Sequence, residues 1–297
     1  AQSWAAEAVA GEHLAAPRSL NEPPIAASPR TEGRKRFMVF RVDFPDYAGE
    51  VMTTNQALTL MIGLSNFMAE ISDHNLIVAP VGQGSTVTPT LRLPNAAESY
   101  KNMGTFLDAC WVAAGALGHG RSDYDYWYVC TASKPTASFA GLGYVGSEGF
   151  WLANRYWDVR TCAHEFGHNL NLYHANWWNT SGRSMLGAGS SEEYGDPFDT
   201  MGASGGGIRH FSAYNKNRTD WIPDSDCPQV TGSGRYRLYA HDVGVPVGVR
   251  GLWFDRPSGG DYWLEFRQLW TANKSLMNGV SLRWSGGSTT LLDFNPG

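Results

Sequence analysis

Three histidines and one glutamate in a short stretch of the chain have the spacing needed to bind a metal ion and to transfer a proton. His164, Glu165 and His168 form the pattern H-E-x-x-H, and His174 follows after five intervening residues. Positions i and i+4 of an α-helix lie on one face, so two imidazoles with this spacing can bind one ion. Zn²⁺ accepts nitrogen ligands, and a catalytic zinc site uses three protein ligands and leaves a fourth position for water. We therefore expect one catalytic Zn²⁺ bound by the three histidines.

The third histidine can reach the same ion only if the helix ends before it. In a continuous helix His174 would lie about 240° around the axis from His168 and would face away from the ion. Asn171 lies between them. After glycine, asparagine is the residue most often found in the left-handed conformation at helix ends. The sequence therefore predicts a helix end at or near Asn171.

Glu165 has the chemistry of a general base. It lies about 100° around the helix from His164, which places it beside the water and not on the ion. A carboxylate there can take the proton of a zinc-bound water that attacks a peptide carbonyl, and can return it to the leaving amine. The stretch is typical of a zinc metalloendopeptidase, a hydrolase of peptide bonds.

Two other arrangements compete for the third ligand position. Glu192 and Asp196 form the pattern E-x-x-x-D, in which a glutamate on a second helix would bind the ion, but the glycines and serines around them are poor helix formers. Cys162 precedes His164 by two residues and lies about 200° away, so it faces elsewhere. The arrangement with His174 is favoured, and the one with Glu192 is the alternative to test.

The segments before this stretch alternate between strands and helices. Apolar residues at helical spacing predict a helix over 55–73. Asn95 is expected to cap a second helix, and Asp158 the helix of the histidines. Strands are predicted at 37–44, 76–81, 86–93 and 126–130, with an extended stretch at 139–153. This alternation predicts an α+β fold in which a twisted mixed sheet supports the active-site helix.

The pattern changes after the third histidine. Residues 175–207 are rich in Gly, Ser and Asn and predict a long irregular loop, and Ser212 is expected to cap one more helix. Later segments separated by turn residues predict a small antiparallel, β-sandwich-like module with strands at 236–239, 249–254, 262–266, 280–284 and 290–292. The predicted domains are a leader, linker or pro-segment remnant at 1–33, a catalytic domain at 34–228 and the module at 229–297.

The composition limits the partners of the chain. Only 17% of the residues are charged and the formal net charge is -5, which argues against nucleic acid because such binding requires clustered Lys and Arg. The longest uncharged stretch, 51–69, is too polar to span a membrane. We expect a monomer that acts on protein or peptide substrates.

The cysteines and the N-terminal stretch bear on the compartment. Four cysteines allow three pairings. In a chain with few charges and many tryptophans we expect two disulfides and therefore a secreted protein. Residues 1–33 are rich in Ala and Pro and predict a disordered tail or the remnant of an inhibitory pro-segment, as in a zymogen. No motif indicates Ca²⁺, and whether the C-terminal module binds this ion stays open. The cysteines are Cys110, Cys130, Cys162 and Cys227.

The histidine stretch resembles the metzincin pattern H-E-x-x-H-x-x-G-x-x-H, with Asn171 in place of the glycine. Within the metzincins the chain is most similar to the gametolysin (autolysin) family. This similarity rests on Asn169 directly after the second histidine, on the segment 194–202 around a methionine, and on the segments 262–267 and 291–296. It implies secretion, synthesis as a zymogen, and substrates among extracellular or cell-wall proteins.

The resemblance also implies two supporting features. Met201, in the turn Asp199-Thr-Met-Gly202, corresponds to the methionine that forms a hydrophobic base beneath the metal site without binding the ion. A second segment resembles the edge strand that pairs with an extended substrate and recognises its backbone. That segment consists of Gly141, Leu142, Gly143, Tyr144 and Val145.

A binding protein is the alternative to an enzyme. In this hypothesis the aromatic-rich C-terminal module adheres to a partner, and the zinc site is structural or vestigial. Replacement of Glu165 separates the two hypotheses, because it abolishes an activity only if the chain is a protease.

Overall fold

The computed structural model describes residues 30–132, 135, 137–202, 210–244, 248–269 and 279–293. Of the leader or pro-segment remnant predicted at 1–33, residues 1–29 lie outside the described part of the chain. The described chain has an α+β fold with three sheets. None of its described helices combines the length and the apolarity needed to cross a membrane.

The chain divides into two units. The N-terminal unit comprises Gly33–Glu70 and His74–Leu172, and the C-terminal unit comprises Tyr173–Gly297 together with Ile71–Asp73 and the described residues before Gly33. The sequence predicts a boundary at residue 228, whereas the units divide after Leu172. The difference arises because strands on both sides of residue 228 belong to one sheet.

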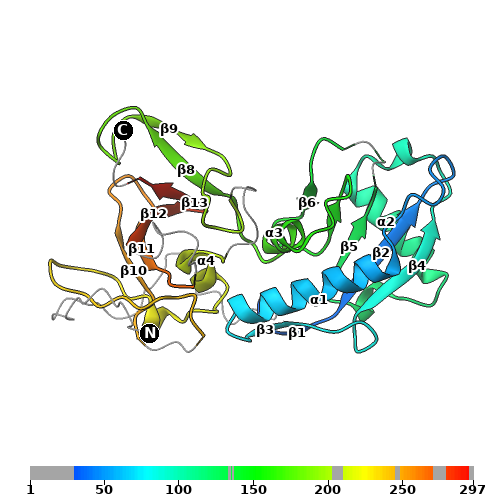
Figure 1. Cartoon of the computed structure of the whole chain (residues 1–297), viewed down its shortest axis with the longest axis horizontal. Coiled ribbons are helices and arrows are strands. Elements are labelled where there is room, and N and C mark those ends of the chain that lie inside the picture. Colours follow the sequence, from blue (N-terminus) through cyan, green and yellow to red (C-terminus); the bar gives the residue numbers. More distant parts are fainter. Residues whose placement is uncertain are drawn as a thin grey trace. The chain divides into compact units, whose positions relative to one another are not determined.

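A five-stranded mixed sheet forms the centre of the N-terminal unit (Figure 1). Four of its strands are parallel, and β6 pairs with β7 in the antiparallel direction at one edge. In sheet order the strands are β4 (Thr86–Arg92), β2 (Phe37–Asp43), β5 (Tyr126–Cys130), β7 (Phe150–Leu152) and β6 (Gly141–Gly143). A separate parallel pair consists of β1 (Gly33–Lys35) and β3 (Leu76–Val78).

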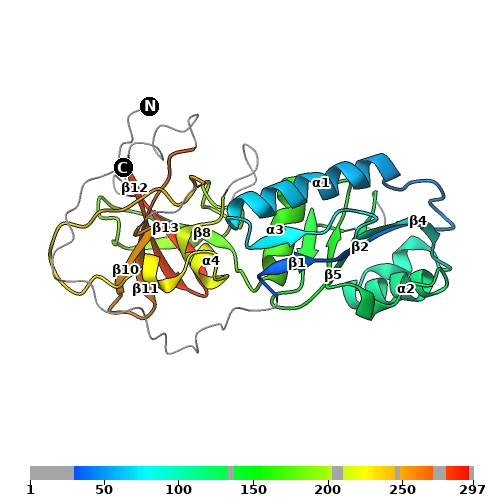
Figure 2. The ribbon, with the colours of Figure 1, turned by 90° about the horizontal axis from the view of Figure 1, so that it is seen from below.

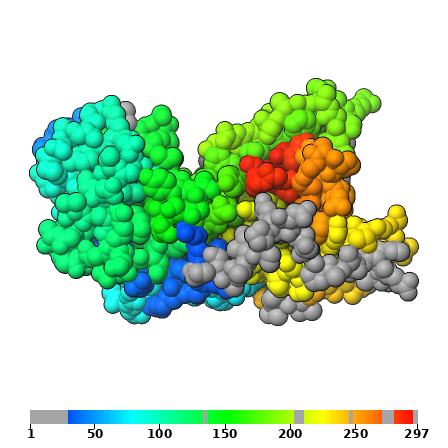
Figure 3. All heavy atoms as spheres, turned by 180° about the vertical axis from the view of Figure 1, so that it is seen from behind, coloured from blue at the N-terminus to red at the C-terminus, as the bar shows by residue number. Residues whose placement is uncertain are grey.

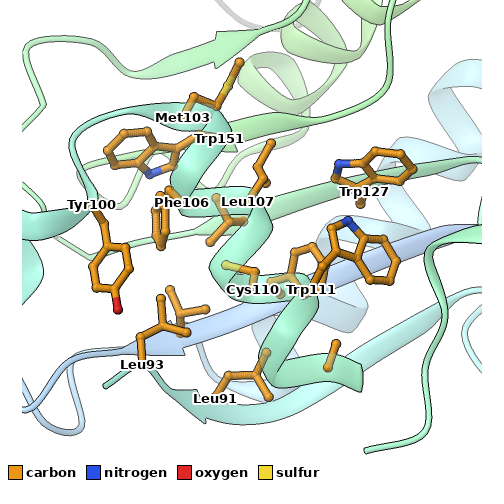
Figure 4. Close-up of a cluster of buried hydrophobic side chains, with 14 of the residues drawn as sticks. Leu91, Leu93, Tyr100, Met103, Phe106, Leu107, Cys110, Trp111, Trp127 and Trp151 are labelled. Atoms are coloured by element: carbon orange, nitrogen blue, oxygen red, sulfur yellow. The ribbon is translucent and has the colours of Figure 1, made fainter. Parts of the chain in front are cut away.

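Helices cover both faces of this sheet. Every residue of β2 is buried, and successive side chains of a strand point to opposite faces, so each face needs a covering layer. α1 (Thr54–Ile71) and α3 (Val159–Asn169) lie on one face, and α2 (Met103–Gly115) lies on the other (Figure 2). Beneath α2, Trp111 packs edge-on against Trp127 within an aromatic-rich core, with ring centroids 5.3 Å apart (Figure 4). This core fills the α2 side of the sheet, and α3 packs on the other side.

Side chains cap the starts of the helices. Asp158 accepts a hydrogen bond from Thr161 N at 2.9 Å, which confirms the predicted start of α3. The prediction for Asn95 is wrong, because a short 3₁₀ turn follows it and α2 begins later. The cap of α2 is Asn102, whose Oδ1 accepts from Thr105 N at 3.2 Å. Asn102 is favoured because it directly precedes the apolar residues that face the sheet.

A six-stranded sheet forms the C-terminal unit. Figure 3 shows β8 and β9, in yellow-green, beside the red strands of the C-terminal end. β8 is parallel to β13, and all other neighbours are antiparallel. In sheet order the strands are β10 (Gly251–Asp255), β11 (Asp261–Phe266), β12 (Val280–Gly286), β13 (Ser288–Leu292), β8 (Ala175–Thr180) and β9 (Gly189–Glu192).

Part of the C-terminal prediction needs correction. The stretch 175–207 is not an irregular loop throughout, since it contains β8 and β9, and no continuous strand forms at 236–239. The four later strands join β8 and β9 in a single sheet, so they do not form a sandwich of their own. Ser212 caps α4 (Ala213–Arg218) as predicted, accepting from Asn215 N at 3.3 Å.

The expectation of two disulfides is not supported. All four cysteines are free and buried. Burial raises the pKa of the Cys110, Cys130, Cys162 and Cys227 thiols, which keeps them protonated and unreactive. Each thiol therefore acts as a small apolar side chain in the core.

Candidate metal centre

Helix α3 packs on the sheet through the side opposite its histidines. Phe166 contacts Phe37 and Tyr126 edge-on, with ring centroids 5.0 and 4.8 Å away. It is two residues from His164 and from His168, which places it about 200° around the helix from either. Anchoring Phe166 to the sheet therefore turns both imidazoles to the other side of the helix.

The helix ends at a left-handed residue, as predicted. Asn171 has a φ of 68°. Its N–H donates to His168 O at 2.8 Å, and the N–H of Leu172 donates to Gly167 O at 3.0 Å. These two bonds form a Schellman motif, which satisfies the last carbonyls of the helix and reverses the chain. The reversal returns the next histidine toward the helix.

Three histidines converge after this reversal. One side-chain nitrogen from each of His164, His168 and His174 lies within 4.8 Å of the other two. The rings of His164 and His168 have centroids 4.9 Å apart and are inclined at 86°, so they do not stack face to face. Among the described residues, this is the one group of three or more potential ligand side chains that converges in this way. The group could hold a metal ion.

Hydrogen bonds to two of the imidazoles leave the ligand nitrogens available. His168 Nδ1 lies 2.8 Å from Leu172 O, and His174 Nδ1 lies 2.7 Å from Glu193 Oε1. A carbonyl or carboxylate oxygen only accepts, so each Nδ1 carries a proton, and in a neutral ring Nε2 then keeps its lone pair. Neutral imidazoles oriented by such bonds are the usual ligands of a transition metal, and the donor set therefore fits one. Sequence reasoning missed Glu193, because the β8–β9 hairpin is what brings it back to the histidine.

Glu165 lies between His164 and His168 in the sequence. Its side chain is buried and accepts a hydrogen bond from the neighbouring strand β6. Its exposed fraction is 5%. Burial raises the pKa of Glu165 to about 8, against the opposing effects of Arg160 and of a hydrogen bond from Gly143 N–H. A bound cation would lower this pKa again by favouring the carboxylate. The group can thus accept and return a proton near neutral pH.

Two glycines of β6 let that strand lie directly against Glu165. A Cβ on Gly141 would collide with the carboxyl group of Glu165, and a Cβ on Gly143 would lie 2.6 Å from the main-chain oxygen of Glu165. Any larger residue would push the strand away from α3. The sequence shows the pattern G-x-G but not this reason for it, since the contact joins distant segments.

β6 lies at the edge of the sheet, and the family resemblance predicts a substrate-binding strand there. Leu142, Tyr144 and Val145 are among the exposed large apolar residues, at 40%, 38% and 44% exposure. Asn169 Nδ2 donates to Tyr144 O at 2.9 Å and to Gly149 O at 3.0 Å. The residue that marks the family resemblance thus ties the edge segment to the histidine helix.

Met201 is fully buried in a tight turn beside the third histidine's strand. Asp199 Oδ1 accepts from Met201 N at 2.8 Å, and Met201 O accepts from Ala175 N at 2.8 Å. The turn is therefore hydrogen-bonded to Ala175, the residue that follows His174. The role of Met201 as a base beneath the ion stays a prediction.

The competing ligands do not join the convergent group. Glu192 lies in β9 and accepts from Asn179 Nδ2 at 2.5 Å, and Asp196 accepts from Arg283 Nε at 2.8 Å. Cys162 is fully buried. The two carboxylates are thus held by hydrogen bonds to other side chains, and the thiol is packed in the core.

No family model and no curated protein matches the chain. Two of the solved structures that resemble it are a chaperone-substrate complex, at 17% identity and a TM-score of 0.35, and metalloproteinase-II from Bacteroides fragilis, at 12% identity and a TM-score of 0.37. Each match covers 64% of this chain, which spans 35% of the first and 54% of the second. Likeness at this level assigns neither a family nor an activity.

Proposed function

We propose that the chain is a zinc-dependent endopeptidase of metzincin type. The convergence of His164, His168 and His174 next to the buried carboxyl of Glu165 carries this proposal. Three neutral nitrogen ligands with one position left for water are typical of a catalytic zinc, whereas a structural zinc has four protein ligands. When bound there, Zn²⁺ supplies Lewis acidity that acidifies water and polarises a carbonyl.

Glu165 performs the proton transfers. A carboxyl with a pKa near the working pH takes a proton from the attacking water and gives it to the nitrogen of the leaving amine. The burial of the Glu165 carboxyl, directly after His164 in the chain, supports this role. The N–H of Gly143 bonds to the Glu165 side chain and restricts its orientation.

The edge strand β6 binds the substrate as an added strand. Backbone groups on a free sheet edge pair with an extended peptide and make few demands on its side chains. Because Gly141 and Gly143 lie against Glu165, a peptide paired with β6 runs close to the general base. Secretion, zymogen activation, a monomeric state and extracellular or cell-wall substrates stay predictions that rest on the family resemblance.

Replacement of Glu165 by Gln tests the function. The variant should keep one equivalent of Zn²⁺ and lose about 10²–10⁴-fold of its activity on a denatured protein, because the metal remains and the proton acceptor is gone. Unchanged proteolysis would exclude this mechanism. Absence of any proteolysis in the zinc-loaded wild type would instead favour the binding protein.

The ligand assignment has its own test. His174→Ala should lose most of the bound Zn²⁺, whereas Glu192→Ala should keep it. The reverse result would favour the arrangement in which Glu192 is the third ligand.

A further inference from the structure

Three charged residues of the C-terminal unit are buried where apolar residues are usual. Glu265, in β11, is 2% exposed, and Arg267 and Arg283 are each 1% exposed. Ions are buried in proteins only when they are paired, and an apolar substitute for a buried ion pair often costs no stability. The partners of these three side chains therefore indicate what the network achieves beyond stability.

The two arginines hold the turn formed by residues 196–202. Arg283 Nε donates to Asp196 Oδ2 at 2.8 Å. Arg267 donates to the main-chain oxygen of Phe198. The turn is thus fixed at two positions by the sheet, once through a carboxylate and once through its backbone.

Glu265 joins the two arginines and a helix end. Its Oε1 accepts from Arg267 at 3.0 Å and also from Arg283. Its Oε2 accepts from Ala213 N at 2.6 Å, at the start of α4. One carboxylate therefore sets the relative positions of both guanidinium groups, and with Asp196 the two arginines face two carboxylates.

The turn and the sheet hold the backbone of the third histidine. Ala175 N donates to Met201 O at 2.8 Å, and Ala175 O accepts from Asp196 N at 3.2 Å. Thr289 N, in β13, donates to His174 O at 3.3 Å. Both backbone groups of Ala175 are bonded to the turn, so a shift of the turn shifts the residue next to His174.

We propose that Glu265, Arg267 and Arg283 are positioning residues for His174. They touch neither the imidazole nor the ion, and they act through the 196–202 turn and the backbone of Ala175. This inference rests on the proposed metal centre. Residues that orient a ligand from outside the metal contacts typically change metal affinity about 10–100-fold when replaced.

A double-mutant cycle in the full chain tests the proposal. The probes are Co²⁺, followed by its ligand-field absorption, and Zn²⁺, followed by calorimetry. Arg283→Met should weaken binding of both ions about tenfold or more and reduce the Co²⁺ absorption, since the third nitrogen is misplaced. In the His174→Ala background the same replacement should have no further effect, because the ligand through which it acts is absent.

Arg250 provides a matched control. It is 4% exposed in the same unit and pairs with Asp73 at 2.7 Å and Asp226 at 3.1 Å, and none of its bonds reaches the turn. Arg250→Met should lower thermal stability without changing the Co²⁺ spectrum. Equal loss of metal affinity in the Arg250 and Arg283 variants would overturn the proposal, as would a persistent Arg283 effect in the His174→Ala background.

Misfolding of the Arg283 variant and failure of the proposed metal centre can each be distinguished from failure of the positioning proposal. If Arg283→Met does not fold, Arg283→Lys takes its place in the cycle, because lysine keeps the buried charge but lacks the fork that reaches two carboxylates. No selective change in its metal affinity would also overturn the proposal. If His174→Ala alone leaves Co²⁺ binding unchanged, the metal centre itself is wrong, which is a failure of the proposed function and not of the positioning network.

Discussion

Glu193 accepts a hydrogen bond from the imidazole of His174, with 2.7 Å between Oε1 and Nδ1. The side chain of His174 is 21% exposed and that of Glu193 is 67% exposed, so the bond lies at the solvent side of the site. It directs the lone pair of Nε2 to the other histidines. The neighbouring glutamate, Glu192, accepts from Asn179 and has no such role.

Glu193→Ala is expected to weaken Zn²⁺ binding by about tenfold, because the His174 ring loses the partner that fixes its tautomer and orientation. Calorimetric titration of the metal-free protein measures this change. Glu192→Ala is the matched control, since it removes an adjacent carboxylate of the same exposed hairpin. Equal affinities for the two variants would show that the bond does not orient the ligand.

Asn171→Ala is expected to destabilise the fold by about 1 kcal/mol and to weaken zinc binding, because alanine resists the left-handed conformation that Asn171 adopts. Asn171→Gly should retain both properties, since glycine adopts this conformation freely. Urea unfolding and metal titration of the two variants provide the comparison. If alanine and glycine behave alike, the reversal of the chain does not depend on this residue.

Gly143→Ala is expected to lower stability by about 1–3 kcal/mol and activity by at least tenfold, because its Cβ would lie 2.6 Å from the backbone of Glu165. Gly115→Ala, where a Cβ meets no atom within 4 Å, is the control and should be neutral or stabilising. Thermal unfolding together with peptide hydrolysis distinguishes them. A Gly143→Ala variant with wild-type turnover would mean that β6 can move without displacing Glu165.

The contribution of His241 to the free energy of unfolding is expected to fall as the pH is lowered from about 6.5 to 4. Burial lowers the pKa of His241 to about 4, and Arg267 Nε donates to its Nε2 at 3.1 Å, which requires the neutral ring. The unfolded histidine has a pKa near 6.5, so between these values the unfolded chain binds the extra proton and is favoured. Urea midpoints at pH 7 and pH 5 measure the effect.

His241→Gln should reduce this pH dependence, and His74→Gln, at an exposed position, should not. Arginines beside Glu265 hold the pKa of that carboxyl well below its usual range against the effect of burial, so its contribution is lost only at still lower pH. An equal change in the unfolding free energy of the wild type and of His241→Gln between pH 7 and pH 5 would contradict this account.

Local chemistry made the convergence of the histidines predictable. The spacing of His164 and His168 follows from the helical repeat, and the need for a break before His174 follows from the same geometry. Asp158 and Asn171 each act through their own backbone neighbours, so their roles as cap and helix end could be derived without tertiary contacts. The same reasoning failed at Asn95 because a second asparagine offered the same cap closer to the apolar face.

Contacts between distant segments were not predictable in this way. The β8 sequence Ala-Asn-Trp-Trp-Asn-Thr has no clear alternation, and it forms a strand because β13 and β9 pair with it. The contact of Gly143 with Glu165 and the bond of Glu193 to His174 likewise form only when the fold brings separate segments of the chain together. The disulfide expectation came from composition alone, with no local chemistry to support it, and the structure has none among its four cysteines.

The parallel pairing of β8 with β13 sets an order of events during folding. Ala175 pairs with Thr289, so this contact closes a long loop and belongs to the class that forms slowly. His164 and His168 come together within one helix and can be in place early. A growing or partly folded chain therefore carries two of the three histidines in position before the third is placed, and the proposed metal centre would be complete only once the β8–β13 pair has closed.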